Sequence, residues 1–165
     1  MKNLMLLMLL TTLSMPVFCQ DFETYENKEK KYSIDFPKGW VTAHEKNAFV
    51  SILAANDGVD LSKRVVVVAS TSVALSTKEA YHVNLRNIKS EKKNTIEEEG
   101  SATINGMEAL WAIYSFDNDG VKTKVKMYVI KNKKMQYIIQ SVIPADDFNA
   151  TVANYDSIIG TFKTI

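Results

Sequence analysis

The stretch IEEEGSATINGMEALWAIYSFDNDGVKTKVKMYVIKNKKMQYIIQSVI, residues 96–143, is the most informative part of the chain about its architecture. Asn-Gly and Asp-Gly pairs tolerate the positive φ that tight hairpin turns require. Such turn sequences separate four segments that are rich in apolar residues, so the stretch predicts a four-stranded antiparallel meander. The expected strands are 96–104, 107–117, 121–130 and 134–143, and the turns are Asn105-Gly106, Asp119-Gly120 and the tip Lys131–Lys133.

Three further strands are expected before this meander. They are Tyr32–Phe36, Ala48–Ala55 and Arg64–Val73. The third contains the run Val65–Ala69, in which apolar and polar residues do not alternate. A continuous apolar run is typical of an interior strand that is covered on both faces.

Two amphipathic helices are expected, one on each side of the meander in the sequence. The first begins at Ser76, because Ser76 and Glu79 have the spacing of a capping box. In the second, we expect Pro144–Asp147 to end the last strand and cap the helix. Each helix carries an apolar stripe at helical spacing. The stripes are Tyr81, Leu85 and Ile88 in the first helix, and Phe148, Val152, Tyr155, Ile159 and Phe162 in the second.

The order of these elements indicates the class of fold. No repeat, linker or low-complexity segment divides residues 32–165, and residues 20–31 form a polar lead-in that we expect to be solvated, with a short helical turn. Strands followed by a helix, then strands and a second helix, are typical of an α+β domain. The sequence therefore predicts a single α+β domain over 32–165.

Residues 1–19 have the organisation of a secretory signal peptide. Lys2 supplies the positive charge, and the apolar run Leu4–Leu13 follows it, with Thr11 and Thr12 as its only interruptions. The run is ten residues long, whereas a membrane-spanning helix needs roughly twenty. We expect cleavage between Cys19 and Gln20, an exported protein in the periplasm or outside the cell, and no transmembrane segment in the mature chain.

Cys19 leaves one alternative open, because a lipoprotein signal also ends at a cysteine. The residue before that cysteine is ordinarily small, and a leucine ordinarily lies three positions before it. Here those positions hold Phe18 and Pro16. Plain cleavage is the preferred prediction, and a lipid anchor at Cys19 is the alternative.

Composition limits what the mature chain can do. Removal of Lys2 leaves 20 − 1 = 19 basic residues against 19 acidic ones. A net charge near zero provides no general attraction to nucleic acid. The single cysteine leaves with the signal, so neither disulfides nor thiol chemistry is expected.

The segment Tyr32–Trp40 (YSIDFPKGW) resembles the opening strand, turn and tryptophan of PsbP-like and DcrB-like domains. The later Asn105-Gly106 hairpin, the long strand pair and the closing amphipathic helix are also similar to that family. The resemblance covers about residues 30–163. It implies the Mog1/PsbP-type fold, an antiparallel β-sheet flanked by helices on both faces (an α-β-α sandwich). It also implies a non-enzymatic module, and it supplies no catalytic residue.

Catalytic and metal-binding patterns are weak. The two histidines, His44 and His82, lie in no recognisable nucleophile context, so a hydrolase is an unfavoured alternative. Asp117–Gly120 resembles the start of a calcium loop, but the position for the bidentate acid is Lys126. We therefore predict a hairpin turn there, no metal site, no cofactor and no enzymatic activity.

A basic hairpin is the one feature that suggests a binding surface. Lys122, Lys124 and Lys126 alternate with Val121, Thr123 and Val125, so the three amines lie on one face of a strand. Lysines on an exposed strand can simply prevent pairing with other chains. They can also bind an acidic partner. The candidate residues for partner binding are Lys122, Lys124, Lys126, Lys133 and Lys134.

These features leave two classes of function. The preferred one is an accessory module that binds an envelope protein or an anionic surface. The alternative is a small-ligand-binding protein with a cleft between sheet and helix, lined by Trp40 or Trp111. Both tryptophans are otherwise expected at the edge of the core.

Overall fold

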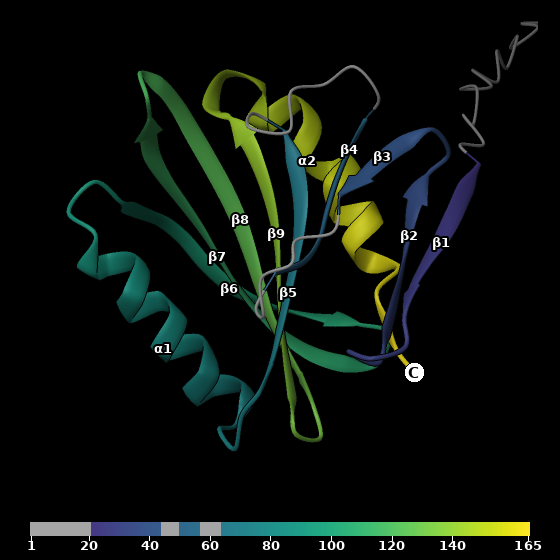
Figure 1. Ribbon diagram of the computed structural model, residues 1–165. Coiled ribbons are helices and arrows are strands. Elements are labelled where there is room, and N and C mark those ends of the chain that lie inside the picture. Colours follow the sequence, from purple (N-terminus) through teal and green to yellow (C-terminus); the bar gives the residue numbers. More distant parts are fainter. Residues whose placement is uncertain (1–20, 44–49, 57–63) are drawn as a thin grey trace, which may run out of the picture.

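The computed structural model describes residues 21–43, 50–56 and 64–165 (Figure 1). The predicted signal peptide, its Cys19–Gln20 cleavage site and His44 lie outside the described residues. Within the described ranges, no helix is long and apolar enough to cross a membrane. The residues in these ranges form one mixed α+β domain with two antiparallel sheets and two helices.

The predicted meander forms as four long strands. Each strand pairs antiparallel with the next along the chain. The turn residues Asn105, Asp119 and Lys133 have φ values of 47°, 51° and 53°, which confirms that the turns use the left-handed region. The strands are β6 (Thr95–Ile104), β7 (Met107–Asn118), β8 (Val121–Asn132) and β9 (Met135–Pro144).

Three strands from earlier in the sequence complete the larger sheet. They are β3 (Trp40–Ala43), β4 (Val50–Asn56) and β5 (Val65–Ser72), and the order is β3-β4-β5-β9-β8-β7-β6. β5 is an interior strand, as its apolar run predicts. Its coverage is unequal, however, because Val66 and Val68 are buried while Val67 and Ala69 are half-buried.

The smaller sheet differs from the expectation of a single sheet. It contains β1 (Phe22–Asn27), β2 (Tyr32–Pro37) and β10 (Lys163–Thr164) in the order β1-β2-β10. The lead-in is therefore a strand and not a helical turn, although most of its side chains are exposed as predicted. β1 is an edge strand and buries little surface, so its composition does not identify it.

The helix α1 (Thr77–Ser90) begins with the predicted capping box. Ser76 Oγ accepts a hydrogen bond from the Glu79 backbone N–H at 3.2 Å, and the Glu79 carboxylate accepts one from the Ser76 N–H at 2.8 Å. As predicted, the last strand ends at Pro144 and the helix α2 (Ala145–Gly160) begins directly after it, with Pro144 as its N-cap residue. No side chain caps the helix by a hydrogen bond, so that part of the expectation is wrong. Asp147 instead forms an ion pair with Arg64.

The core contains two clusters of buried apolar side chains, and successive residues of β8 alternate between them. The first cluster contains Val125, Met127 and Val129, and the second contains Tyr128 and Ile130. The first cluster includes the buried residues of α1, namely Ala80, Tyr81 and Leu85. The second includes those of α2, namely Phe148, Tyr155, Ile158 and Ile159.

Candidate functional site

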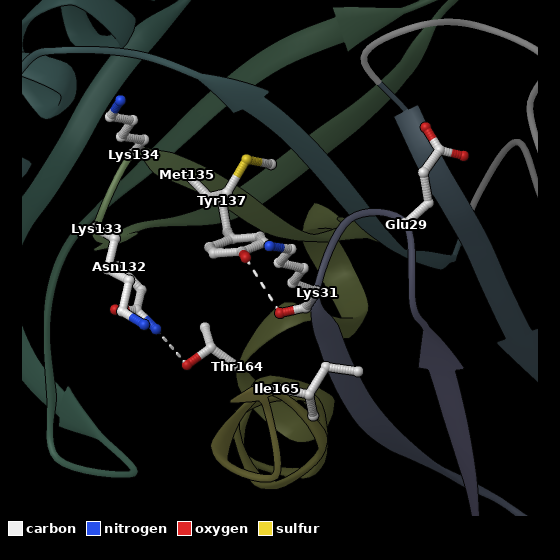
Figure 2. Close-up of a pocket in the computed structure, with 9 residues that line it drawn as sticks. All are labelled: Glu29, Lys31, Asn132, Lys133, Lys134, Met135, Tyr137, Thr164 and Ile165. Atoms are coloured by element: carbon white, nitrogen blue, oxygen red, sulfur yellow. Dashed lines mark hydrogen bonds between the residues drawn. The ribbon is translucent and has the colours of Figure 1, made fainter.

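A pocket of about 420 Å³ lies beside the tip of the β8–β9 hairpin (Figure 2). Three segments that are distant in the sequence form its walls: the β1–β2 turn, the hairpin tip with the start of β9, and residues 164–165. The lining residues are Glu29, Lys31, Asn132, Lys133, Lys134, Met135, Tyr137, Thr164 and Ile165.

Hydrogen bonds hold the three walls together. Asn132 Nδ2 donates to Thr164 Oγ1 at 2.5 Å, which joins the hairpin to β10. The buried Tyr137 hydroxyl lies 2.9 Å from the Lys30 carbonyl oxygen and 3.2 Å from that of Lys31. The Ile165 backbone N–H donates to the Lys31 carbonyl at 3.1 Å. The pocket is therefore a fixed part of the fold.

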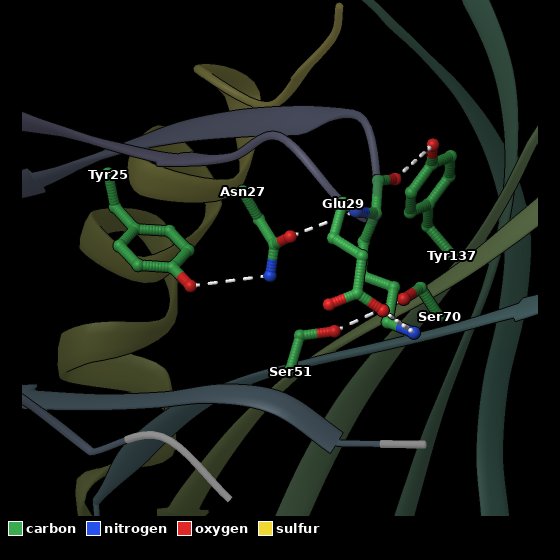
Figure 3. A network of polar contacts seen from close by, with 7 residues as sticks. Tyr25, Asn27, Glu29, Ser51, Ser70 and Tyr137 are labelled. Atoms are coloured by element: carbon green, nitrogen blue, oxygen red, sulfur yellow. Dashed lines mark hydrogen bonds and ion pairs between the residues drawn. The ribbon is translucent and has the colours of Figure 1, made fainter. Parts of the chain in front are cut away.

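The β1–β2 turn is itself ordered by side chains (Figure 3). Asn27 Oδ1 accepts a hydrogen bond from the Lys30 N–H at 2.9 Å, and Asn27 Nδ2 donates to the Tyr25 hydroxyl at 3.4 Å. Lys31 has a φ of 58°, which closes the turn. These contacts fix the backbone from which Glu29 and Lys31 enter the pocket lining.

The pocket has a positively charged rim. Lys31, Lys133 and Lys134 are exposed, and no carboxylate of the described residues forms an ion pair with any of them. Glu29 is the acidic lining residue, and its carboxylate pairs with Lys30 at 2.9 Å. An anion at this rim would approach three ammonium groups that lack a carboxylate partner in the described part of the chain.

A second, open hollow of about 480 Å³ lies along the same hairpin tip. Its lining includes Lys131, Lys133 and Lys134 together with residues 72–74. Lys131 Nζ donates to the Val73 carbonyl at 3.0 Å. Lys133 and Lys134 therefore border both hollows, and the structure brings these two predicted residues together at the candidate site.

The other three predicted lysines lie toward the opposite end of β8. Lys122 is exposed, but Lys124 Nζ pairs with Glu97 at 2.6 Å and Lys126 Nζ pairs with Asp156 at 2.6 Å. The hydrogen bond from Lys124 holds the pKa of the Glu97 carboxyl below its usual value. The account in which these lysines protect an exposed strand is wrong, because β8 lies between β9 and β7 and Lys126 pairs with Asp156 on α2. As a partner-binding surface, the face stays a prediction.

Lys126 occupies the most enclosed of these positions, with 13% of its side chain exposed. Its ammonium group lies 5.0 Å from the centre of the Trp111 ring and 5.3 Å from that of Tyr128. Burial opposes its charge, but hydrogen bonding to Asp156 and Tyr128 raises its pKa above the usual value. The charge of Lys126 is thus compensated inside the domain.

The two tryptophans are half-buried and lie in different places. Trp40 stacks on Phe36 with ring centres 6.1 Å apart, and it lines a separate small pocket of about 160 Å³. Trp111 lies over Gly100 and does not line the hairpin-tip pocket. Ligand stacking by either tryptophan stays a prediction.

Other sequence candidates have structural contacts. The His82 ring lies 5.6 Å from that of Tyr81. Asp117 Oδ1 accepts a hydrogen bond from the Gly120 N–H at 2.7 Å, as a hairpin turn requires. Among the described residues, no group of three or more His, Cys, Asp and Glu side chains could hold a metal ion.

Sequence reasoning missed Lys31, Tyr137 and Thr164 as site residues. Lys31 belongs to a polar turn, Tyr137 to a buried strand and Thr164 to a two-residue strand. Each has a local role, so no pattern in the chain marks it for binding. The pairing of β2 with β10 and the hydrogen bonds of Tyr137 and Asn132 bring these segments together in the folded chain.

The arrangement of elements corresponds to a PsbP-like fold. No protein-family model matches the chain, and no curated protein matches it. Among solved structures, cyanobacterial PsbP (CyanoP) from Synechocystis sp. PCC 6803 has a TM-score of 0.70 and 11% identity, covering 91% of this chain and 96% of that one. At this level of identity the similarity establishes the fold alone.

Two other solved structures share the fold at a similarly low sequence identity. LpqN of Mycobacterium tuberculosis, described as involved in cell envelope biogenesis, has a TM-score of 0.63 and 12% identity, with 88% of this chain and 91% of that chain covered. PA94 of Pseudomonas aeruginosa, described as of unknown function, has a TM-score of 0.55 and 11% identity, with 85% and 94% covered. These descriptions name no enzymatic activity.

Proposed function

We propose that this protein is an exported accessory module that binds an envelope protein or complex without catalysing a reaction. Export would use residues 1–19, with cleavage between Cys19 and Gln20, and a lipid anchor at Cys19 is the alternative. The mature protein would then act in the periplasm or outside the cell. The envelope role described for LpqN and the PsbP-like fold support this proposal.

One observation carries the binding role: the basic rim of the hairpin-tip pocket. Lys31, Lys133 and Lys134 come from two separate segments, and no carboxylate among the described residues compensates them by an ion pair. Opposite charge on a partner increases the association rate and orients the complex. We therefore place the partner-binding surface at this rim, and not at Lys124 or Lys126, whose charges are compensated internally.

The packing of the larger sheet would hold the hairpin tip, and with it the basic rim, in a fixed position. Alternate residues of a strand point to opposite faces of a sheet. Because alternate β8 residues contact the clusters of α1 and α2, we infer that the two helices cover opposite faces of the larger sheet. The hairpin tip would then project from a sheet that is supported on both sides.

Crosslinking in intact cells of the source organism tests this function. The tagged protein is purified and its crosslinked partners are identified by mass spectrometry. Lys133→Glu/Lys134→Glu should remove an envelope partner from the set. The matched control is Lys92→Glu/Lys93→Glu, which reverses two adjacent exposed charges after α1 and should retain the partner. Equal recovery with both variants would contradict the placement at the rim.

A small-ligand function has specific support from the same pocket. Its volume of about 420 Å³ falls within the range of roughly 300–1,000 Å³ that is typical of ligand sites. The pocket does not occupy the position expected from the sequence, between sheet and helix near a tryptophan. An accessory module can hold a ligand and a protein partner at one surface.

A further inference from the structure

We infer that the hairpin-tip pocket binds an organic anion that carries one phosphate or carboxylate group on a short apolar chain. This inference rests on the proposed function, because it names a ligand for the same surface. It follows from three properties of the pocket: the charge at its rim, the apolar groups in its lining, and its size.

The rim selects the charged group. The lysines of the β1–β2 turn and of the hairpin tip both border the pocket, so positive charge lies on two of its walls. Ammonium groups form strong charge-assisted hydrogen bonds to carboxylate and phosphate oxygens. Glu29 is the acidic side chain in the lining, and its charge is compensated by the ion pair with Lys30 at 2.9 Å. The three lysines of the rim therefore leave an excess of positive charge there.

The lining selects an apolar group beside the charge. Met135, Tyr137 and Ile165 contribute a thioether, an aromatic ring and a branched alkyl chain. The Tyr137 hydroxyl donates to the carbonyls of Lys30 and Lys31, the second of which Figure 2 shows, so the ring is fixed in place. Ile165 is 55% exposed, and an apolar ligand would remove part of that surface from water.

The size of the pocket excludes a simple ion as its full occupant. Its volume of about 420 Å³ is in the range of roughly 300–1,000 Å³ that is typical of sites for small organic molecules. A bare phosphate would neutralise the rim and leave the exposed Ile165 side chain in contact with water. A chain of several carbons attached to the anion would fill this space.

Isothermal titration calorimetry of the purified protein tests the inference with four probes. Octyl phosphate and sodium octanoate carry both features, octanol has only the chain, and inorganic phosphate has only the charge. We expect saturable binding of octyl phosphate, octanoate or both, and affinities for octanol and inorganic phosphate that are at least tenfold weaker. A difference between the first two probes distinguishes a phosphate-bearing ligand from a carboxylate-bearing one.

Three variants locate the binding. Lys133→Gln/Lys134→Gln removes rim charge, and Ile165→Asp places a negative charge in the lining at an exposed position where folding should be unaffected. Each should weaken binding at least tenfold. Lys92→Gln/Lys93→Gln is the matched control and should change the affinity less than twofold. Circular dichroism melts verify that each variant is folded.

Each contrary result overturns a stated part of the inference. Equal binding of octanol shows that the charge is not needed, and equal binding of inorganic phosphate shows that the chain is not needed. Absence of binding by all four probes rejects the ligand class. If no probe binds but Lys133→Glu/Lys134→Glu still loses the crosslinked partner, the proposed function stands and the inference about the ligand fails. If octyl phosphate or octanoate binds but the variant keeps every crosslinked partner, the ligand site stands and the proposed partner-binding function fails.

Discussion

Gly100 and Trp111 form a directly opposed pair across β6 and β7, and the substitution Gly100→Ala tests what holds this edge of the sheet together. A Cβ atom added at Gly100 would lie 2.5 Å from Trp111 Cζ2 and 2.7 Å from Cε2. Ordinary van der Waals contact begins at 3.4 Å. The indole ring must therefore move by about 1 Å, away from a position where it packs on the core and lies 5.0 Å from Lys126 Nζ.

The size of the effect follows from two opposing contributions. Adding a methyl group to a packed site typically costs about 1–3 kcal/mol. Replacing glycine by alanine where φ is compatible contributes about 0.4–1 kcal/mol of stability by restricting the unfolded chain. The φ of Gly100 lies outside the left-handed region, so this gain applies. We expect a net loss of about 1–2 kcal/mol, which is a few degrees in Tm for a domain of this length.

A double-mutant cycle with Trp111→Leu isolates the steric contribution. Urea unfolding is followed by far-UV circular dichroism for the wild type, both single variants and the double variant. With leucine at position 111 the steric conflict is removed, so Gly100→Ala should change sign and stabilise by about 0.4–1 kcal/mol. If Gly100→Ala destabilises equally in both backgrounds, the contact with Trp111 is not the cause and this explanation fails.

Four further predictions concern the contacts that join the elements. Thr161→Val removes the Oγ1 acceptor of the Asp35 N–H at 2.8 Å, and chemical denaturation should show a loss of about 1–2 kcal/mol, whereas Thr161→Ser should be nearly neutral. Asn105→Gly keeps the left-handed turn but loses the bonds from Nδ2 to the Gly160 and Phe162 carbonyls, at 2.9 and 2.8 Å, and should cost about 1 kcal/mol. Asn105→Ala should cost about 1 kcal/mol more, because alanine disfavours φ of 47°, and equal losses for the two variants would argue against backbone strain. Glu97 has a lowered pKa because of its hydrogen bond from Lys124, so its contribution to stability is complete above its usual value of 4.5 and declines as the pH falls below it. In thermal melts at a series of pH values, Glu97→Gln should reduce the loss of stability below this pH. The substitution of its exposed neighbour, Glu98→Gln, should leave that loss unchanged. Burial raises the pKa of Tyr114 to about 12, so its contribution is complete below its usual value of 10 and is lost as the pH rises between these values. Tyr114→Phe should reduce the loss of stability over that alkaline range, and an unchanged alkaline limb would count against the burial of this phenol.

The parts of the fold that the sequence predicts are those with a local cause. Asn105 and Asp119 indicate their turns because few other residues tolerate a left-handed backbone. Ser76 and Glu79 indicate the start of α1 because both groups of the capping box are three residues apart. In each case the stabilising partner is close in the chain, so the pattern contains the whole explanation.

The parts that the sequence does not predict depend on distant partners. Phe22–Asn27 has little apolar content, and it forms a strand because β2 pairs with it along its whole length. Lys126 has the sequence pattern of an exposed residue in an alternating strand, and only the position of Asp156 on α2 makes it a partly buried ion pair. The candidate pocket has the same origin, since its walls meet only in the folded chain.

The two-residue strand β10 has a consequence for the order of events during synthesis. Ser33 pairs with Lys163, which is 163 − 33 = 130 residues later in the chain. While the chain emerges from the ribosome, β2 has one edge unpaired, and the closure of so long a loop is slow. The smaller sheet is therefore completed after the meander, and the wall formed by Thr164 and Ile165 arrives with it. The binding that we propose at the hairpin tip would thus be available only to molecules that have finished folding.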